Sequence, residues 1–269
     1  MMSWKIVQDA PTATAGLDLA VARRQRLGAL VDARRAIRLE ELSAALGVSQ
    51  ATVRRDLNAL AAAGRLRRVH GGAVAVDERL DEPHFDVKAA AFAEQKARIA
   101  ARAVELLGPD DTVYLDSGST VLAVARLLHG WTRLTVVTNS LPVANELVGR
   151  GPRLIVVGGE LRATSRALVG PLTRLLLEAV HVDRALVGTF AFSLEDGLTT
   201  TDPAEAYTKQ LVLERAREVL LLAASAKFGT RSFVHAGRLE DVDVLVTDDG
   251  LEERAARALT RRGVRVITT

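Results

Sequence analysis

Polar and glycine-rich segments in the C-terminal half of the chain have the chemistry to bind a small anion. Asp116-Ser117-Gly118-Ser119-Thr120 follows an apolar run and opens a helical stretch, so its free backbone N–H groups suit a phosphate or carboxylate. Two later apolar runs end in Thr138-Asn139 and in Gly158-Gly159. If these runs are neighbouring parallel strands, we expect the three segments to surround one pocket. For the first segment alone, an ordinary strand-to-helix turn is the alternative.

Three charged side chains are further candidates for this pocket. Glu205 and Lys209 are four residues apart on a predicted helix, where a simple surface pair is the alternative. Lys227 follows another apolar run and could neutralise a phosphate as a point charge. One Glu and two Lys could also move protons between carbon atoms, so an isomerase-like enzyme is a competing function. We nevertheless predict no enzyme and assign no catalytic residue, because the sequence gives Glu205 and Lys209 no evident desolvating context.

The N-terminal half carries a different pattern, which suits DNA. Two predicted helices, 39–46 and 50–63, are separated by the tight turn Gly47-Val48-Ser49. In the second helix apolar residues at 53, 57 and 60 face a core, which leaves an outward set of candidate DNA contacts: Ser49, Gln50, Ala51, Thr52, Arg54 and Arg55. Gln and Arg can read adenine and guanine, and methyl groups can contact thymine. Asp56 is expected to orient a neighbouring arginine, and a solvated helix face is the alternative for the arginine pair.

The residues after this helix predict a basic hairpin. Arg65, Arg67 and Arg68 are expected to lie along the DNA backbone or minor groove, and His70 is either a turn residue or a DNA contact. Residues 1–76 contain twelve Lys and Arg against six Asp and Glu, although the whole chain has a formal charge of only +3. A basic N-terminal part on a mildly acidic remainder is typical of a protein in which one domain meets polyphosphate.

The periodicity places these motifs on a two-domain chain. We predict a loose arm over 1–21, a winged helix-turn-helix over 22–76 with a first helix at 22–35, a linker over 77–93, and an α/β domain over 94–269. In the last domain, apolar runs alternate with helical stretches, which predicts a mostly parallel sheet covered on both faces. The expected strands are 112–115, 134–137, 154–157, 184–187, 218–223, 244–246 and 264–267.

Composition narrows the chemistry further. The 269 residues include no cysteine, which excludes disulfides, thiolate metal sites and cysteine nucleophiles and is compatible with a reducing cytoplasm. No apolar run is long enough to span a bilayer, and the first residues lack the pattern of a leader. We therefore expect a cytoplasmic protein with no metal site and no cofactor.

The motif at 49–57, followed by His70-Gly71-Gly72-Ala73, resembles the DeoR family of bacterial transcriptional regulators. Ser49, Thr52, Val53, Arg54, Arg55, Asp56 and Leu57 match its signature. The resemblance covers about 22–269, because further motifs occur in the order of the family's sensor domain: Glu94 to Ala100, Asp116 to Thr120, Thr138-Asn139, Gly158-Gly159, Gly170, Asp183, Glu205, Lys209, Lys227 to Gly229 and Thr247-Asp248.

The resemblance implies a sensor similar to sugar-phosphate isomerases of the ribose-5-phosphate isomerase type. It further implies a phosphorylated sugar or similar effector, repression, and a homo-oligomer that reads paired half-sites on double-stranded DNA. One departure is Ala224, where many members have an aspartate three residues before the lysine that matches Lys227. A non-specific architectural DNA-binding protein, indifferent to ligand, is the remaining alternative.

Overall fold

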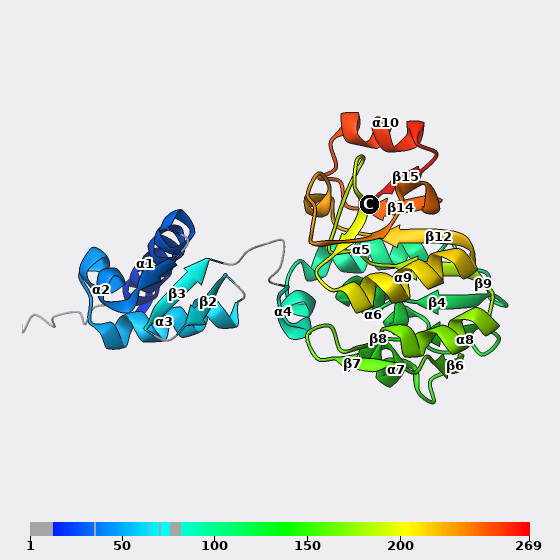
Figure 1. Cartoon of the computed structure of the whole chain (residues 1–269), viewed down its shortest axis with the longest axis horizontal. Coiled ribbons are helices and arrows are strands. Elements are labelled where there is room, and N and C mark those ends of the chain that lie inside the picture. Colours follow the sequence, from blue (N-terminus) through cyan, green and yellow to red (C-terminus); the bar gives the residue numbers. More distant parts are fainter. Residues whose placement is uncertain (1–12, 35, 64, 70, 76–81) are drawn as a thin grey trace, which may run out of the picture. The chain divides into compact units, whose positions relative to one another are not determined.

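The computed structural model describes residues 13–34, 36–63, 65–69, 71–75 and 82–269. The chain divides into two compact units, Met1–Asp77 and Glu78–Thr269. Within the described residues no helix combines the length and the apolar character that crossing a membrane requires. The two units are described separately below, and both are drawn in Figure 1.

The N-terminal unit is a winged helix-turn-helix. Its described elements are α1 (Ala13–Arg34), β1 (Ala36–Arg38), α2 (Leu39–Leu46), α3 (Gln50–Ala62), β2 (Leu66–Val69) and β3 (Gly72–Ala75). The helices pack around fully buried Leu27, Val31, Leu42 and Val53. The three strands form an antiparallel sheet in the order β1-β3-β2, and the β2–β3 hairpin is the predicted wing.

Two features of this unit differ from the prediction. Helix α1 begins at Ala13 rather than at residue 22, so only residues 1–12 of the expected arm lie outside the described residues. Alanine and leucine, the strongest helix formers, recur from residue 13 onward and favour this extension. Strand β1 was not predicted, because three residues are too few for an alternating pattern.

Glycine and serine residues fix the turns that shape this unit. Gly47 ends α2 with φ of 66°, and the Ser49 hydroxyl accepts the backbone N–H of Thr52 at 3.3 Å to cap α3. In the wing, a Cβ atom added at Gly72 would lie 2.3 Å from the carbonyl oxygen of Ile37. Only glycine therefore lets β3 approach β1 this closely.

The C-terminal unit is an α/β domain. Its elements as far as β8 are α4 (Phe85–Ala90), α5 (Ala93–Val104), β4 (Thr112–Leu115), α6 (Ser119–Leu127), β5 (Thr135–Thr138), α7 (Leu141–Leu147), β6 (Arg153–Val156), β7 (Glu160–Arg162) and β8 (Ala167–Val169). There follow the 3-10 helix η1 (Pro171–Thr173), α8 (Arg174–Ala179), β9 (Val182–Val187), β10 (Ala191–Ser193), β11 (Gly197–Thr200), α9 (Pro203–Arg215), β12 (Ala216–Leu222), η2 (Ser225–Lys227), β13 (Val234–Gly237), η3 (Leu239–Asp241), β14 (Val244–Thr247), α10 (Glu253–Arg261) and β15 (Arg265–Thr268).

In the described part of this unit, seven strands form a parallel sheet in the order β15-β14-β12-β9-β4-β5-β6. The order reverses direction between β4 and β9, because later strands are added on both sides of this pair. The predicted parallel sheet is confirmed, with strand bounds shifted by one or two residues. A small antiparallel sheet, β10-β11-β13, and the β7–β8 hairpin accompany it.

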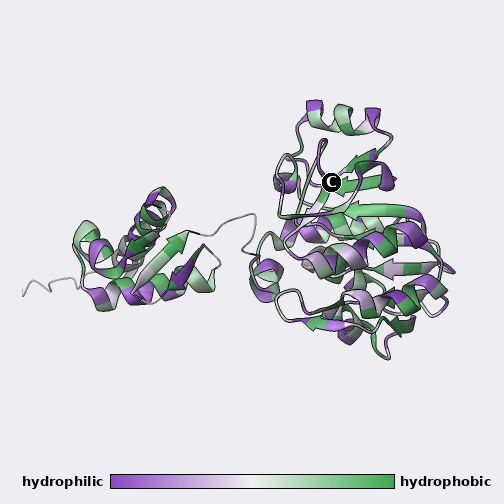
Figure 2. Ribbon diagram, viewed as in Figure 1, coloured by the Kyte–Doolittle hydropathy of each residue, from purple (hydrophilic) through white to green (hydrophobic). Residues whose placement is uncertain are grey.

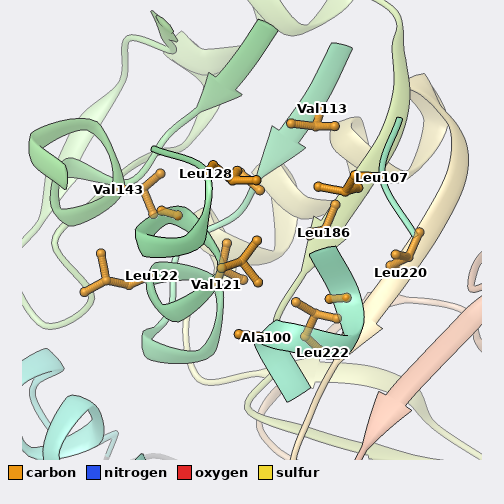
Figure 3. Close-up of a cluster of buried hydrophobic side chains, with 14 of the residues drawn as sticks. Ala100, Leu107, Val113, Val121, Leu122, Leu128, Val143, Leu186, Leu220 and Leu222 are labelled. Atoms are coloured by element: carbon orange, nitrogen blue, oxygen red, sulfur yellow. The ribbon is translucent and has the colours of Figure 1, made fainter. Parts of the chain in front are cut away.

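A hydrophobic core lies on each face of the parallel sheet. Figure 2 shows how hydrophobic and hydrophilic residues are distributed along its strands and helices. On β4, Val113 and Leu115 face the core under α5, α6 and α7, whereas Tyr114 faces the core that also contains side chains of α8, α9 and α10. Figure 3 shows the first of these cores, to which strands contribute Val113 and Leu186 and α6 contributes Val121. This alternation with a period of two is what a doubly covered parallel sheet requires.

The second half of the predicted linker is part of this domain, so the linker interpretation of 77–93 is wrong there. Residues 85–90 form α4, and Phe85 is buried in the core of the C-terminal unit with only 4% of its surface exposed. The backbone N–H of Phe85 also donates to the carbonyl of Thr164 at 2.9 Å. The sequence did not reveal this helix, because Phe85 is surrounded by charged residues and a proline and shows no apolar periodicity.

Candidate DNA-reading helix and ligand cavity

The N-terminal end of α3 presents the polar set that the sequence singled out. Ser49, Gln50, Ala51, Arg54 and Arg55 are exposed, and Thr52 is half-buried. Val53 and Leu57 lie on the opposite side in the core, at 0% and 1% exposure. The helix therefore keeps its guanidinium and amide groups free for another molecule, as a recognition helix does.

Asp56 fastens this helix to α1. Its carboxylate is 2% exposed and accepts hydrogen bonds from Arg23 Nε at 2.5 Å and from Arg24 Nε at 3.3 Å. The hydrogen bond to Asp56 raises the pKa of Arg23 above its usual value. The sequence predicted an arginine partner for Asp56, and the structure takes both partners from α1. Asp56 thus fixes the angle at which α3 is presented.

We expect Asp56→Ala to destabilise the N-terminal unit by about 2 kcal/mol, because two arginines lose a charged hydrogen-bond acceptor. Calorimetry of the full chain separates the unfolding of the two units and measures this loss. Asp32→Ala is the matched control, since Asp32 lies exposed on the same α1 and should change stability by less than about 0.5 kcal/mol. Equal effects of the two substitutions would contradict the role of Asp56.

The wing adds cations next to α3. Arg65, Arg67 and Arg68 are exposed, and Arg68 Nη1 donates to Asn58 Oδ1 of α3 at 2.5 Å. Arg68 is therefore directed along the recognition helix, whereas no ion pair to Arg65 or Arg67 is found among the described residues. His70, the last candidate on the wing, lies outside the described residues.

In the C-terminal unit a cavity lies at the carboxyl ends of β4 and β9. It is lined by Glu82, Lys88, Ser117, Gly118, Ser119, Thr120, Val121, Ser165, Gly188, Thr189, Phe190, Thr200, Glu205, Lys209, Leu222 and Lys227. Because the strand order reverses between β4 and β9, this is the topological switch point, where parallel sheets bind ligands. The structure thus brings the predicted residues 117–120, Glu205, Lys209 and Lys227 to one place.

The loop after β4 supplies backbone donors to the cavity. Gly118 precedes α6 with φ of 133°, a conformation that favours glycine, and no side chain caps the helix there. The first N–H groups of α6 therefore face the cavity at residues 119 and 120 without a side-chain acceptor. An anion at this helix N-terminus would satisfy them.

Asp116 was predicted as a ligand contact, but in the structure its carboxylate binds other residues of the site. It is 5% exposed, pairs with Lys209 Nζ, and accepts the backbone N–H of Gly188 through Oδ2 at 3.1 Å. This carboxylate therefore joins the loops after β4 and β9 and orients Lys209. Glu205 and Lys209 do not form the surface pair that their spacing allowed, because each has a different buried partner.

Four other predicted contacts lie outside the cavity: Thr138, Asn139, Gly158 and Gly159. Thr138 Oγ1 donates to the carbonyl of Leu115 at 2.6 Å, and Asn139 Nδ2 donates to the carbonyl of Leu168 at 3.1 Å. A Cβ atom at Gly159 would lie 2.9 Å from the backbone nitrogen of Val169. These residues join the ends of β4, β5 and β6 to each other and to β8, so the expectation of one pocket across three consecutive strand ends is wrong.

Sequence reasoning missed a buried network on the opposite wall of the cavity. Glu82, whose side chain is 6% exposed, pairs with Lys88 and with Arg162 Nη1 at 2.7 Å. Arg162 also donates to Glu205 Oε1 at 3.1 Å, and Thr200 donates to Glu205 Oε2 at 3.0 Å. Glu82 and Lys88 lie close to Pro83 in a segment without periodicity. The sequence therefore gave no sign that they contribute to a site.

Burial and neighbouring charges set the ionisation of this site. Burial raises the pKa of Glu205, and the nearby Glu82 carboxylate adds to this rise. Burial also lowers the pKa of Lys227 to about 8, with the cations of Lys88 and Lys96 acting in the same direction. Lys227 Nζ donates to the carbonyl of Thr189 at 2.6 Å and forms no ion pair within the described residues. A positive charge without a carboxylate partner therefore remains for a ligand.

We expect the affinity of the cavity for a phosphate monoester to fall about tenfold between pH 7 and pH 9. The Lys227 ammonium is charged below its pKa of about 8 and neutral above it, so its attraction for an anion is present at low pH and lost as pH rises. The phosphate itself is a dianion throughout this range, because its second pKa is about 6. Calorimetric titration with glycerol 3-phosphate measures the effect, and a flat profile would exclude Lys227 as a contact.

The cavity thus offers two chemistries at once. One part provides the N–H groups at the start of α6 and the cation of Lys227, which suit a phosphate or carboxylate. The other part provides the carboxylate of Glu205 and the hydroxyl groups of Ser165 and Thr200, which suit neutral hydroxyl groups. Among the described residues no cluster of His, Asp and Glu could hold a metal ion.

Comparison with known proteins agrees with this arrangement. Residues 23–79 match the DeoR-like helix-turn-helix domain, and residues 91–249 match the DeoR C-terminal sensor domain. The HTH-type transcriptional regulator GlpR of Haloferax volcanii is 38% identical over 93% of this chain and 98% of its own. The glycerol-3-phosphate regulon repressor of Escherichia coli K12 is 35% identical over 78% of this chain and 83% of its own.

Solved structures are more distant. Ribose 5-phosphate isomerase A of Methanocaldococcus jannaschii is 18% identical, with a TM-score of 0.38 over 51% of this chain and 54% of its own. The probable sor operon regulator of Shigella flexneri is 17% identical, with a TM-score of 0.38 over 62% of this chain and 88% of its own. The two domain matches and the full-length relatives together show that the chain belongs to the DeoR family of DNA-binding transcriptional regulators.

Proposed function

We propose that this protein represses genes of sugar or polyol metabolism and that a phosphorylated metabolite in the C-terminal cavity controls its affinity for DNA. The observation that carries the proposal is the cavity itself, in which uncompensated Lys227 and the N-terminus of α6 lie near Glu205, Ser165 and Thr200. Relatives are named as the glycerol-3-phosphate regulon repressor and the putative aga operon transcriptional repressor, which supports this class of regulon. The protein acts in the cytoplasm as a homo-oligomer on paired half-sites.

In this proposal the DNA contacts are Ser49, Gln50, Ala51, Thr52, Arg54 and Arg55 of α3, with Arg65, Arg67, Arg68 and His70 on the wing. Arg54 and Arg55 are exposed on the recognition helix, and no ion pair to either is found among the described residues. An arginine in this position can donate two hydrogen bonds to one guanine. The wing arginines supply affinity for phosphates without regard to sequence.

We expect Arg54→Ala to reduce the preference for the cognate site over scrambled DNA by about 1–3 kcal/mol, because a lost bidentate base contact costs that much. Fluorescence anisotropy on both DNAs measures the preference. Arg174→Ala is the control, since Arg174 is an exposed arginine on the sensor domain. An equal loss of affinity for both DNAs would make Arg54 a phosphate contact instead.

The experiment that tests the proposed function is a titration of the full chain against its own upstream DNA and a scrambled duplex at about 0.15 M salt. It is repeated with glycerol 3-phosphate, ribose 5-phosphate and hexose phosphates. We expect tighter binding to the upstream DNA and a change in that affinity with one of these ligands. Equal, salt-sensitive binding to both duplexes without any ligand effect would favour a non-specific architectural role.

A further inference from the structure

The tip of the β7–β8 hairpin carries a buried hydroxyl group without an ordinary hydrogen bond. Ser165 is 3% exposed and lines the ligand cavity, yet its Oγ lies within hydrogen-bond distance of no partner among the described residues. A buried hydroxyl without a partner is costly and uncommon in folded proteins. Such a group at the wall of a cavity therefore points to a partner that arrives with the ligand.

The position of Ser165 is enforced by the residues on both sides of it. Arg166 has φ of 54°, a left-handed conformation that a non-glycine residue keeps only when its surroundings hold it there. Its guanidinium pairs with Asp86 and lies 5.6 Å from the centre of the Phe85 ring. Because Thr164 also accepts the N–H of Phe85, the whole hairpin tip is fastened to α4. These contacts hold Ser165 in its position at the wall of the cavity.

The neighbours of Ser165 decide which part of a ligand it meets. It lies close enough to Glu205 to lower the pKa of that carboxyl against the rise caused by burial, although no hydrogen bond of ordinary length joins the two side chains. Glu205 in turn accepts from Thr200, and the carboxylate of Glu82 belongs to the same network through Arg162. Lys88 and Arg162 neutralise these two carboxylates, so this wall keeps no spare positive charge for a phosphate and suits neutral hydroxyl groups of the ligand.

We propose that the Ser165 hydroxyl is a specificity-determining contact, which hydrogen-bonds a hydroxyl group of the ligand and selects polyhydroxylated phosphates over phosphates of equal charge without hydroxyls. This inference rests on the proposed function and deepens it. Lys227 and the N-terminus of α6 bind the charge, which all phosphate monoesters share. Ser165 distinguishes among them, because a buried group built for a hydroxyl discriminates against a ligand that lacks one.

The test compares glycerol 3-phosphate with n-propyl phosphate, which has the same carbon chain and charge but no hydroxyl groups. Both are titrated calorimetrically into the full-length protein and into the Ser165→Ala variant, with ribose 5-phosphate as a second polyol probe. We expect the variant to bind the better polyol phosphate about tenfold more weakly and to bind n-propyl phosphate as the unaltered protein does. Unchanged affinity for both polyol phosphates, or an equal loss for all three ligands, would overturn the proposal.

Thermal unfolding without ligand gives an independent readout. Ser165→Ala is expected to leave the melting temperature unchanged or to raise it, since removing a buried hydroxyl that has no partner removes a cost. Ser193→Ala is the matched control: Ser193 is also buried, but it accepts the N–H of Asp196 at 2.9 Å, so its removal should lower the melting temperature. A clear drop for Ser165→Ala would mean that the hydroxyl has an internal role and would refute the inference.

The same titrations distinguish failure of the proposed function from failure of the role given to Ser165. If the unaltered protein binds none of the polyol phosphates better than n-propyl phosphate, the effector class is wrong and this inference falls with it. If the unaltered protein prefers a polyol phosphate and Ser165→Ala keeps that preference, the effector class stands and only the role of Ser165 is wrong.

Discussion

We expect Lys209→Met to destabilise the sensor domain by about 3–5 kcal/mol, because the substitution leaves the Asp116 carboxylate buried without its cation. The two side chains are 8% and 7% exposed, so water cannot replace the lost partner. Asp116 keeps one hydrogen bond from the backbone N–H of Gly188, which is too little to compensate for a buried charge. Calorimetric unfolding of the full chain in the absence of ligand measures the loss.

Two further variants show whether the buried charge is the cause. Arg174→Met breaks the exposed pair with Glu178 and should cost less than about 0.5 kcal/mol. Adding Asp116→Asn to Lys209→Met removes the stranded charge while keeping an acceptor for Gly188, so the double variant should recover most of the lost stability. A loss below about 1 kcal/mol for Lys209→Met, or no recovery in the double variant, would contradict this account.

The N-terminal domain was largely predictable because local signals determine it. Gly47 and Ser49 mark a turn through their own backbone preferences, and the spacing of Val53 and Leu57 identifies the buried side of α3. The partners of Asp56 were not predictable, since Arg23 and Arg24 are more than thirty residues away in the chain. Which arginine reaches a buried carboxylate depends on how helices pack.

The sensor domain shows a different limit. Alternation of apolar residues identifies strands, but it does not give the order in which strands join the sheet. The sequence therefore grouped the ends of β4, β5 and β6, whereas the cavity lies where β4 meets β9. The contribution of Glu82 and Lys88 to the cavity was not predictable either. Their segment lies on the domain through tertiary contacts, such as the packing of Phe85 in the core and against Arg166.

The site around Lys227 has a positive charge without a carboxylate beside it. Ala224 precedes η2 and offers no acid, and Lys227 has no carboxylate partner in the described structure. The position of the lysine is kept by other means: Ser225 at the start of η2 donates to Asp248 through both its backbone N–H, at 2.8 Å, and its hydroxyl, at 2.6 Å. The turn is therefore fixed while the ammonium stays unneutralised.

We accordingly expect Lys227→Gln to weaken the binding of a phosphorylated effector by about 10- to 100-fold, which corresponds to the loss of one charged hydrogen bond of about 1.5–3 kcal/mol. The fold of η2 does not depend on this ammonium, because Ser225 and Asp248 hold the turn. DNA affinity without ligand should not change, and the response of DNA binding to effector should need correspondingly more ligand. Anisotropy titrations at fixed DNA and increasing glycerol 3-phosphate or ribose 5-phosphate measure both quantities.

A change of charge elsewhere on the sensor domain provides the comparison. Arg257→Gln removes an exposed cation on α10 that pairs with Glu253 away from the cavity, and it should leave the effector response unaltered. The pH dependence adds a sharper criterion, since the fall in affinity between pH 7 and pH 9 should become much shallower in Lys227→Gln. If the variant keeps both its effector affinity and the pH dependence, Lys227 does not bind the phosphate. Lys96 is then the group that titrates, because burial and the neighbouring Lys88 also lower its pKa to about 8.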